Sequence, residues 1–133
     1  MLRHFALVAA IALLGCDSTE PSVIAGTWTA TEFTITESGE QPQDVLAAGG
    51  SLTIVVSSNN TTSGSMTIPA SLTGGSAVTE SMEGTATVNG ASVEFSQSAD
   101  TFVRDLTWTF AGSSLTANQT VSGVTLDITL TRQ

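Results

Sequence analysis

The chain of 133 residues is poor in several residue types that enzymes and nucleic-acid-binding proteins commonly use. It has no tyrosine, one cysteine, one histidine and three basic residues, all arginine, against twelve Asp and Glu, for a formal net charge of -9. Nucleic acids are bound by clustered Lys and Arg, so this balance excludes a nucleic-acid partner. The length fits a single domain. Hydrophobic residues make up 41% and charged residues 11%, which predicts a folded chain rather than a disordered acidic tail.

Residues 1–15 have the pattern of a signal peptide. Arg3 is followed by an apolar run from Phe5 to Leu14. At about ten residues the run is shorter than the roughly 20 that span a bilayer as a helix, so we interpret it as the core of an export signal. The only histidine, His4, lies in this segment and would be removed with it.

The apolar run ends in Leu13-Leu14-Gly15-Cys16, which resembles the lipobox of bacterial lipoproteins. The resemblance implies cleavage before Cys16 and lipidation of that residue. The alternative is an unpaired thiol in an exported protein, because a single cysteine cannot form an intramolecular disulfide. Residues 16–23 then form the lipidated end and a polar tether, and residues 24–133 form the domain. We expect a bacterial cell-envelope protein held to a membrane by its lipid, with the inner or outer membrane left open.

From residue 26 onward the sequence alternates apolar with polar residues, and no stretch of ten residues has a helical period. The pattern predicts a nearly all-β domain with one wet and one buried face. The expected strands cover residues 26–36, 51–57, 62–69, 77–88, 92–97, 101–110, 114–119 and 124–132. We interpret 77–88 as one long strand bent at Gly84, and expect a bulge near Glu32, where the alternation slips. Asn89-Gly90 predicts a tight hairpin turn.

Eight consecutive strands with short connections predict an antiparallel up-and-down β-barrel, which leaves no exposed sheet edge. The alternative is a β-sandwich. Gly26-Thr27-Trp28 at the first strand and Arg132 at the last resemble the lipocalin-like families of the calycin group. In those families a Gly-x-Trp packs under an arginine at the closed end of the barrel, which implies this role for Gly26, Trp28 and Arg132. The alternation is consistent with it, because Arg132 has inward phase and the two strand ends lie at one end of an eight-stranded barrel.

The mature chain offers little for catalysis. After removal of the signal peptide and lipidation of Cys16 it has no imidazole, free thiol, lysine or tyrosine, which excludes Ser-His and Cys-His nucleophiles and any His/Cys zinc site. A carboxylate-pair hydrolase is the remaining alternative, but the acidic residues are scattered over the strands and show no specific pairing. We therefore expect no enzyme activity, no metal site and no cofactor.

Two charged residues fall in the inward rows near the far end of the barrel. Arg104 shares the phase of Phe102 and Leu106, and Glu80 that of its apolar neighbours. A buried charge needs a partner. The alternatives are an Arg104–Glu80 ion pair, a ligand carboxylate bound by Arg104, or an Arg104 side chain that extends to water at the rim.

The longer loops lie at the end opposite Trp28, which is the expected mouth. In the longest, residues 37–50, the segment 44–48 followed by two glycines predicts one helical turn. It either places Val45 and Leu46 over the mouth as a lid or packs them on the rim as a surface turn.

Two functions follow from this architecture. The first is binding of a small hydrophobic or amphipathic molecule inside the barrel. The second is a structural or interaction lipoprotein whose barrel is filled by its own side chains, since an eight-stranded barrel can be filled or hold one small ligand. In either case we expect a monomer. The expected ligand-lining residues are Arg104, Glu80, Phe33, Ile35, Met66, Phe102, Leu106 and Trp108.

Overall fold

The computed structural model describes residues 22–133. The predicted signal peptide, Cys16 and most of the tether lie outside these residues. The elements, in chain order, are β1 (Gly26–Glu37), β2 (Gln43–Asp44), β3 (Ser51–Val56), β4 (Thr61–Ile68), α1 (Ala70–Thr73), β5 (Val78–Ser81), β6 (Gly84–Asn89), β7 (Ser92–Gln97), η1 (a 3-10 helix, Phe102–Asp105), β8 (Thr107–Ala111), β9 (Ser114–Val121) and β10 (Val124–Arg132). No helix in this part of the chain is long and apolar enough to cross a membrane.

Eight strands close into an antiparallel barrel, as the sequence predicts. Neighbours in the chain are neighbours in the sheet, in the order β10-β9-β8-β7-β6-β4-β3-β1, and β1 pairs with β10 to close the ring. The short strands β2 and β5 pair only with β1 and β4. The β-sandwich alternative is therefore wrong, because a sandwich would leave β1 and β10 as separate edges.

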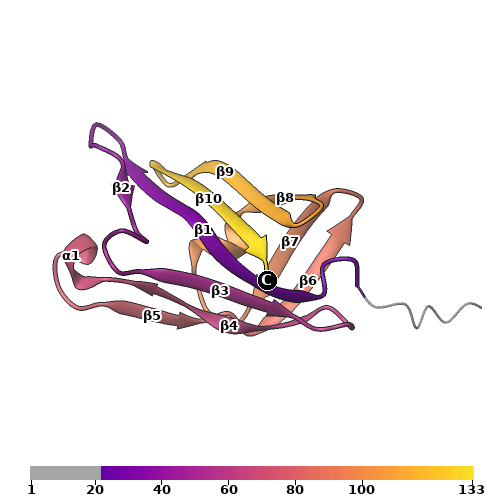
Figure 1. Cartoon of the computed structure of the whole chain (residues 1–133). Helices are drawn as coiled ribbons and strands as arrows, with labels where there is room; N and C mark the ends of the chain where they lie inside the picture. The colour runs from indigo at the N-terminus through magenta and orange to yellow at the C-terminus, as the bar shows by residue number, and fades with distance from the viewer. Residues whose placement is uncertain (1–21) are drawn as a thin grey trace, which may run out of the picture.

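The two ends of the barrel differ. In Figure 1, α1 and β2 lie at the left end of the barrel, and β1 begins toward the right end. We call the end that holds the first residues of β1 and the last of β10 the closed end, and the opposite end the mouth. Short turns join the strands at the closed end, and the longer connections that contain α1 and η1 lie at the mouth.

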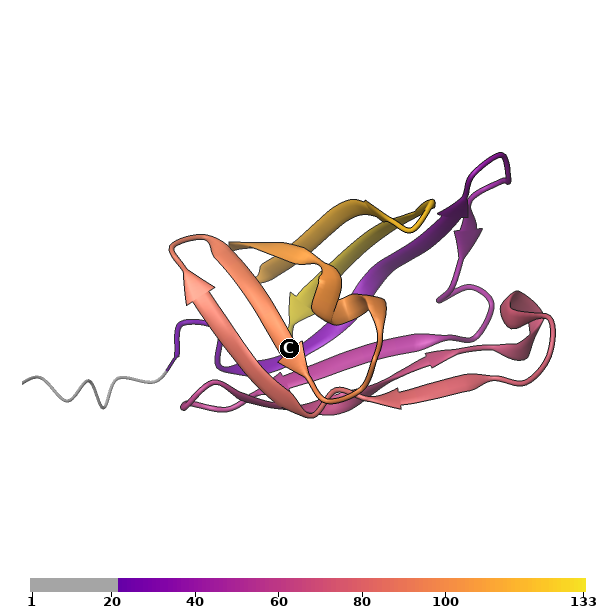
Figure 2. The same ribbon diagram turned by 180° about the vertical axis from the view of Figure 1, so that it is seen from behind.

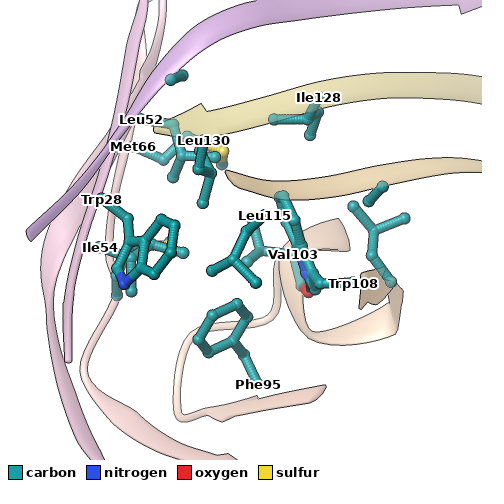
Figure 3. Packing of buried hydrophobic residues seen from close by; sticks show 14 of the residues in the cluster. Trp28, Leu52, Ile54, Met66, Phe95, Val103, Trp108, Leu115, Ile128 and Leu130 are labelled. Atoms are coloured by element: carbon teal, nitrogen blue, oxygen red, sulfur yellow. Dashed lines mark hydrogen bonds between the residues drawn. The ribbon is translucent and has the colours of Figure 1, made fainter. Parts of the chain in front are cut away.

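Alternation places the core inside the barrel, as predicted. Leu126, Ile128 and Leu130 of β10 are buried, and β1 contributes Trp28 and Phe33 from the adjacent strand. The bulge in β1 is confirmed: the register against β10 shifts between Ala30 and Glu32, which leaves Glu32 exposed. Figure 3 shows the large side chains gathered in the interior.

The predicted strand over 77–88 is two strands. β5 and β6 keep one register along β4, but the pairing is interrupted at Met82 and Glu83. There the Met82 carbonyl accepts hydrogen bonds from the Thr62 hydroxyl (2.7 Å) and the Gln97 side-chain amide (3.4 Å). After this interruption, β6 pairs with β4 only at Gly84 and Thr85, and it pairs with β7 along its whole length.

The predicted strand over 101–110 is also wrong in its first half. Residues Phe102–Asp105 form η1, and β8 begins only at Thr107. Figure 2 shows the segment between β7 and β8 as a coiled turn. A 3-10 helix has three residues per turn, which brings Val103 and Leu106 to the same side, and both are buried. The alternation predicted that Phe102 and Arg104 point inward. The 3-10 turn instead buries Val103 and leaves Arg104 exposed.

Candidate functional site

The closed end is sealed by the predicted tryptophan–arginine contact. The Arg132 guanidinium carbon lies 4.6 Å from the centroid of the Trp28 ring, and Trp28 is fully buried. The guanidinium donates a 2.7 Å hydrogen bond to the Val23 carbonyl, and the Trp28 indole N–H donates to the Ile24 carbonyl at 2.8 Å. Gly26 lies beside this contact: its φ of 140° is a backbone conformation that favours glycine, and a Cβ there would be in ordinary contact with the Arg132 side chain at 3.5 Å.

The middle of the barrel is filled. Trp108 is fully buried and its ring meets Phe95 edge-on, with centroids 5.9 Å apart. Met66 and Leu106 are also buried in the same cluster. Of the expected ligand-lining residues, Phe33, Met66, Leu106 and Trp108 therefore belong to the packed core.

A pocket of about 380 Å³ remains at the mouth. We call it the mouth pocket. Its apolar wall comes from β1, β4, η1, β9 and β10, and its polar residues come from η1, the residues before it and the β9–β10 turn. The lining residues are Ile35, Ile68, Asp100, Thr101, Phe102, Asp105, Val121, Ser122, Val124 and Leu126. Of these, Ile35 and Phe102 are the two residues predicted from the sequence to contact a ligand.

The turn η1 shapes this pocket because it occupies the side of the mouth where β7 and β8 have separated. Two side chains hold it. The Trp108 indole N–H donates to the Val103 carbonyl at 3.4 Å. The Gln119 side chain of β9 accepts from the Thr107 amide at 3.1 Å and donates to the Asp105 carbonyl at 3.2 Å. The half-buried Phe102 ring packs 5.8 Å from that of Phe33 and forms part of the pocket wall.

The expected inward placement of Arg104 is wrong. Its guanidinium forms a 2.7 Å ion pair with Asp100, four residues earlier, and its side chain is 36% exposed. Glu80, half-buried on β5, forms no salt bridge with Arg104 or another described residue. The reason is again η1, which turns Arg104 outward. Arg104 therefore resembles the third alternative, a side chain extended to water, and its charge is already matched.

The loop before β3 contains the predicted helical turn but does not form a lid. The Ala48 amide donates to the Asp44 carbonyl, and the Asp44 carboxylate accepts from the Ala47 amide at 3.1 Å. Val45 is fully buried in the core and Leu46 packs against it. Neither lines the mouth pocket. The lid alternative is therefore wrong, and the rim-packing alternative is correct only in part, because Val45 lies in the core rather than on the rim.

One polar group at the pocket stands out. Thr101 is 7% exposed, and its hydroxyl oxygen is buried with no hydrogen-bond partner among the described residues. Buried hydroxyl groups are normally hydrogen-bonded, so an unpaired one beside a pocket marks a position where a bound molecule could supply the partner.

The sequence contains one indication of the turn η1 beside the pocket, but the alternating pattern of the predicted strand masked it. Asp100 and Arg104 are spaced i, i+4, which favours a helical turn rather than a strand. A strand would have placed these two side chains on one face but about 13 Å apart along the chain. Within residues 22–133, no group of three or more His, Cys, Asp and Glu side chains could hold a metal ion.

Comparisons with protein-family models, with curated proteins and with solved structures gave no match.

Proposed function

We propose that this is a lipid-anchored cell-envelope protein that binds a small apolar or amphipathic molecule in the mouth pocket. The observation that carries the proposal is a pocket of about 380 Å³ with a mainly apolar wall, above a core that is otherwise packed. Small-molecule pockets usually have volumes of about 300–1,000 Å³ and a few placed polar groups. The role proposed is binding rather than catalysis, because the charged groups that line the pocket are two exposed carboxylates, Asp100 and Asp105.

The contact of Trp28 with Arg132 beside Gly26 supports a relation to the calycin group, and we include that relation in the proposal. Fold alone does not fix function, so the ligand proposal depends on the pocket and not on this relation.

Titration with a neutral fluorescent probe, N-phenyl-1-naphthylamine, tests the binding proposal. Val121 is half-buried at the mouth pocket, and Val121→Trp should fill part of the pocket and weaken probe binding about tenfold or more, a change of about 1.4 kcal/mol. The matched control is Val88→Trp, because Val88 is half-buried on β6 near the closed end. Equal probe binding by Val121→Trp and the wild type would contradict the assignment of the site.

The lipid anchor is the second part of the proposal. The Leu-Leu-Gly-Cys sequence that ends at Cys16 supports it. We expect mass spectrometry of the protein made in a bacterium to find Cys16 as the acylated first residue. Cys16→Ser should abolish both cleavage at this bond and fractionation with membranes. A Cys16→Ser protein that is still cleaved there and still membrane-bound would contradict the anchor.

The anchor and the pocket would lie at opposite ends of the molecule. The Ser22 amide donates a 3.0 Å hydrogen bond to the Ser58 carbonyl, so the described chain begins beside the β3–β4 turn at the closed end. An extended chain from Cys16 to Ser22 spans at most about 20 Å. A lipid on Cys16 would therefore hold the closed end toward the membrane, and the mouth pocket would face the aqueous phase.

A second candidate is favoured by the packed interior. Trp28 at the closed end and Phe33 and Trp108 further inside are fully buried, as expected of an interaction lipoprotein whose barrel is filled by its own side chains. Absence of probe binding by the folded wild type would favour this candidate.

A further inference from the structure

We propose that the molecule bound in the mouth pocket is a cationic amphiphile, a small apolar body that carries an ammonium group. This inference rests on the proposed binding function and adds to it the sign of the ligand's charge. It reverses the carboxylate ligand that the sequence pattern around Arg104 left open.

The polar lining of the pocket is acidic. Asp100 and Asp105 both contribute to the wall, and no basic residue does. Asp105 has no salt-bridge partner among residues 22–133. Its own carbonyl is bonded to the Gln119 side chain, so the backbone that carries this carboxylate is held in place beside the apolar wall.

The two arginines of the described chain are both engaged elsewhere. Arg104 is paired with Asp100 at 2.7 Å on the exposed side of η1. Arg132 lies over the Trp28 ring at the closed end, with its guanidinium bonded to the Val23 carbonyl. Neither is free to receive a carboxylate inside the mouth pocket. Asp100 and Asp105 carry two negative charges and Arg104 carries one positive charge, so one negative charge is left at the pocket.

Further carboxylates lie on the β1 side of the mouth. Glu37 ends β1 opposite Val124, a pocket residue, and its neighbour Ser38 is bonded to Gly123 of the β9–β10 turn. Glu40 and Asp44 follow in the same exposed connection. The summed field of these groups attracts a cation to the mouth and repels an anion, since charges in one region act together over a Debye length of about 10 Å at 0.1 M salt.

Thr101 provides an independent observation at the same place. Its hydroxyl oxygen is buried and unpaired, and the residue lines the pocket between Asp100 and Phe102. A hydroxyl group both donates and accepts hydrogen bonds, so this oxygen can accept one from a ligand ammonium, and the neighbouring carboxylates set the sign of the charge. A ligand ammonium near Asp105 and Thr101, with its apolar body against Phe102 and Leu126, would satisfy the charge and the unpaired oxygen together.

Three octyl compounds with the same apolar body separate charge from hydrophobic contact. Octylamine, octanol and octanoate are each used to displace N-phenyl-1-naphthylamine from the full chain at low salt. We expect octylamine to bind about five-fold more tightly than octanol, which is the scale of one partly exposed ion pair, and octanoate to bind more weakly than both. Raising the salt concentration should reduce the differences in affinity among the three compounds, because salt screens the charge of the pocket.

Two variants assign the effect to residues. Asp105→Asn should reduce octylamine binding to the level of octanol and leave octanol binding unchanged. Glu94→Gln is the control, because Glu94 is exposed on β7 and is not a pocket residue. Thr101→Val keeps the side-chain volume and removes the hydroxyl, and it should weaken octylamine binding without lowering the melting temperature. Unchanged octylamine binding by Thr101→Val would overturn the role given to this hydroxyl.

The outcomes distinguish the two levels of the proposal. If the probe and all three octyl compounds fail to bind the folded protein, the proposed binding function is wrong, and this inference falls with it. If octanol binds and octylamine binds no more tightly than octanoate, the proposed binding function is supported and the proposal of a cationic ligand is wrong. Retention of the octylamine preference in Asp105→Asn would also overturn it.

Discussion

Trp28→Ala is expected to lower the free energy of unfolding by about 3–5 kcal/mol, because it removes a fully buried indole from the closed end. The lost contacts include an edge-on packing with Phe110, whose ring centroid lies 6.2 Å away, and the Arg132 guanidinium at 4.6 Å. Urea denaturation of the wild type and the variant measures the change.

The cation–π contact can be isolated with a double-mutant cycle. Arg132→Ala should cost less than Trp28→Ala, and the two losses should differ from additivity by about 0.5–2 kcal/mol because the residues touch. Arg104→Ala is the matched control, since this arginine lies at the mouth and should be additive with Trp28→Ala. Additive losses for Trp28 and Arg132 would contradict the energetic role of the contact and remove its support for a relation to the calycin group.

Gly84→Ala is expected to lower the free energy of unfolding by about 3 kcal/mol, because the added methyl group has no room in the barrel wall. Gly84 lies between β4 and β7, opposite Thr62 on one side and Gln97 on the other. An added Cβ would collide with the Ser96 carbonyl oxygen and would lie 2.7 Å from the Gln97 Cα. Both are backbone atoms, so β6 and β7 would have to move apart at the point where the sheet passes from β4 to β7.

Gly75→Ala is the control for this variant. Gly75 lies in the exposed connection between α1 and β5, and a Cβ there would meet nothing within 4 Å. Its effect should be within about 0.5 kcal/mol. A Gly84→Ala protein whose urea midpoint matches that of Gly75→Ala would show that the β6–β7 approach is not as tight as described.

The barrel could be predicted from the sequence because the period of two is strong where strands pair along their whole length. In β10 the alternation from Val124 to Leu130 is unbroken, and the inward phase of Arg132 leads directly to its contact with Trp28. The position of the closed end follows from the number of strands. In an up-and-down barrel with an even number of strands, the last strand ends at the same end of the barrel where the first strand begins.

The mouth could not be predicted in the same way. Phe102, Arg104 and Leu106 alternate as a strand would, but they lie on a 3-10 turn that is held by tertiary hydrogen bonds from Gln119 and Trp108. Because these hydrogen bonds form only in the folded barrel, the local sequence pattern does not predict the 3-10 turn. The error in phase then placed Arg104 inside and left Asp100, Thr101 and Asp105 unnoticed.

The most direct test of the central claim is to locate the bound probe by NMR. Backbone amide shifts of the ¹⁵N-labelled protein are followed during titration with N-phenyl-1-naphthylamine. Binding in the mouth pocket predicts that the saturating shifts cluster at Thr101, Phe102, Ser122 and Val124, while Trp28 and Arg132 at the closed end stay unchanged. Shifts confined to the outer wall or to the closed end, or no saturable shift in the folded protein, would contradict the claim.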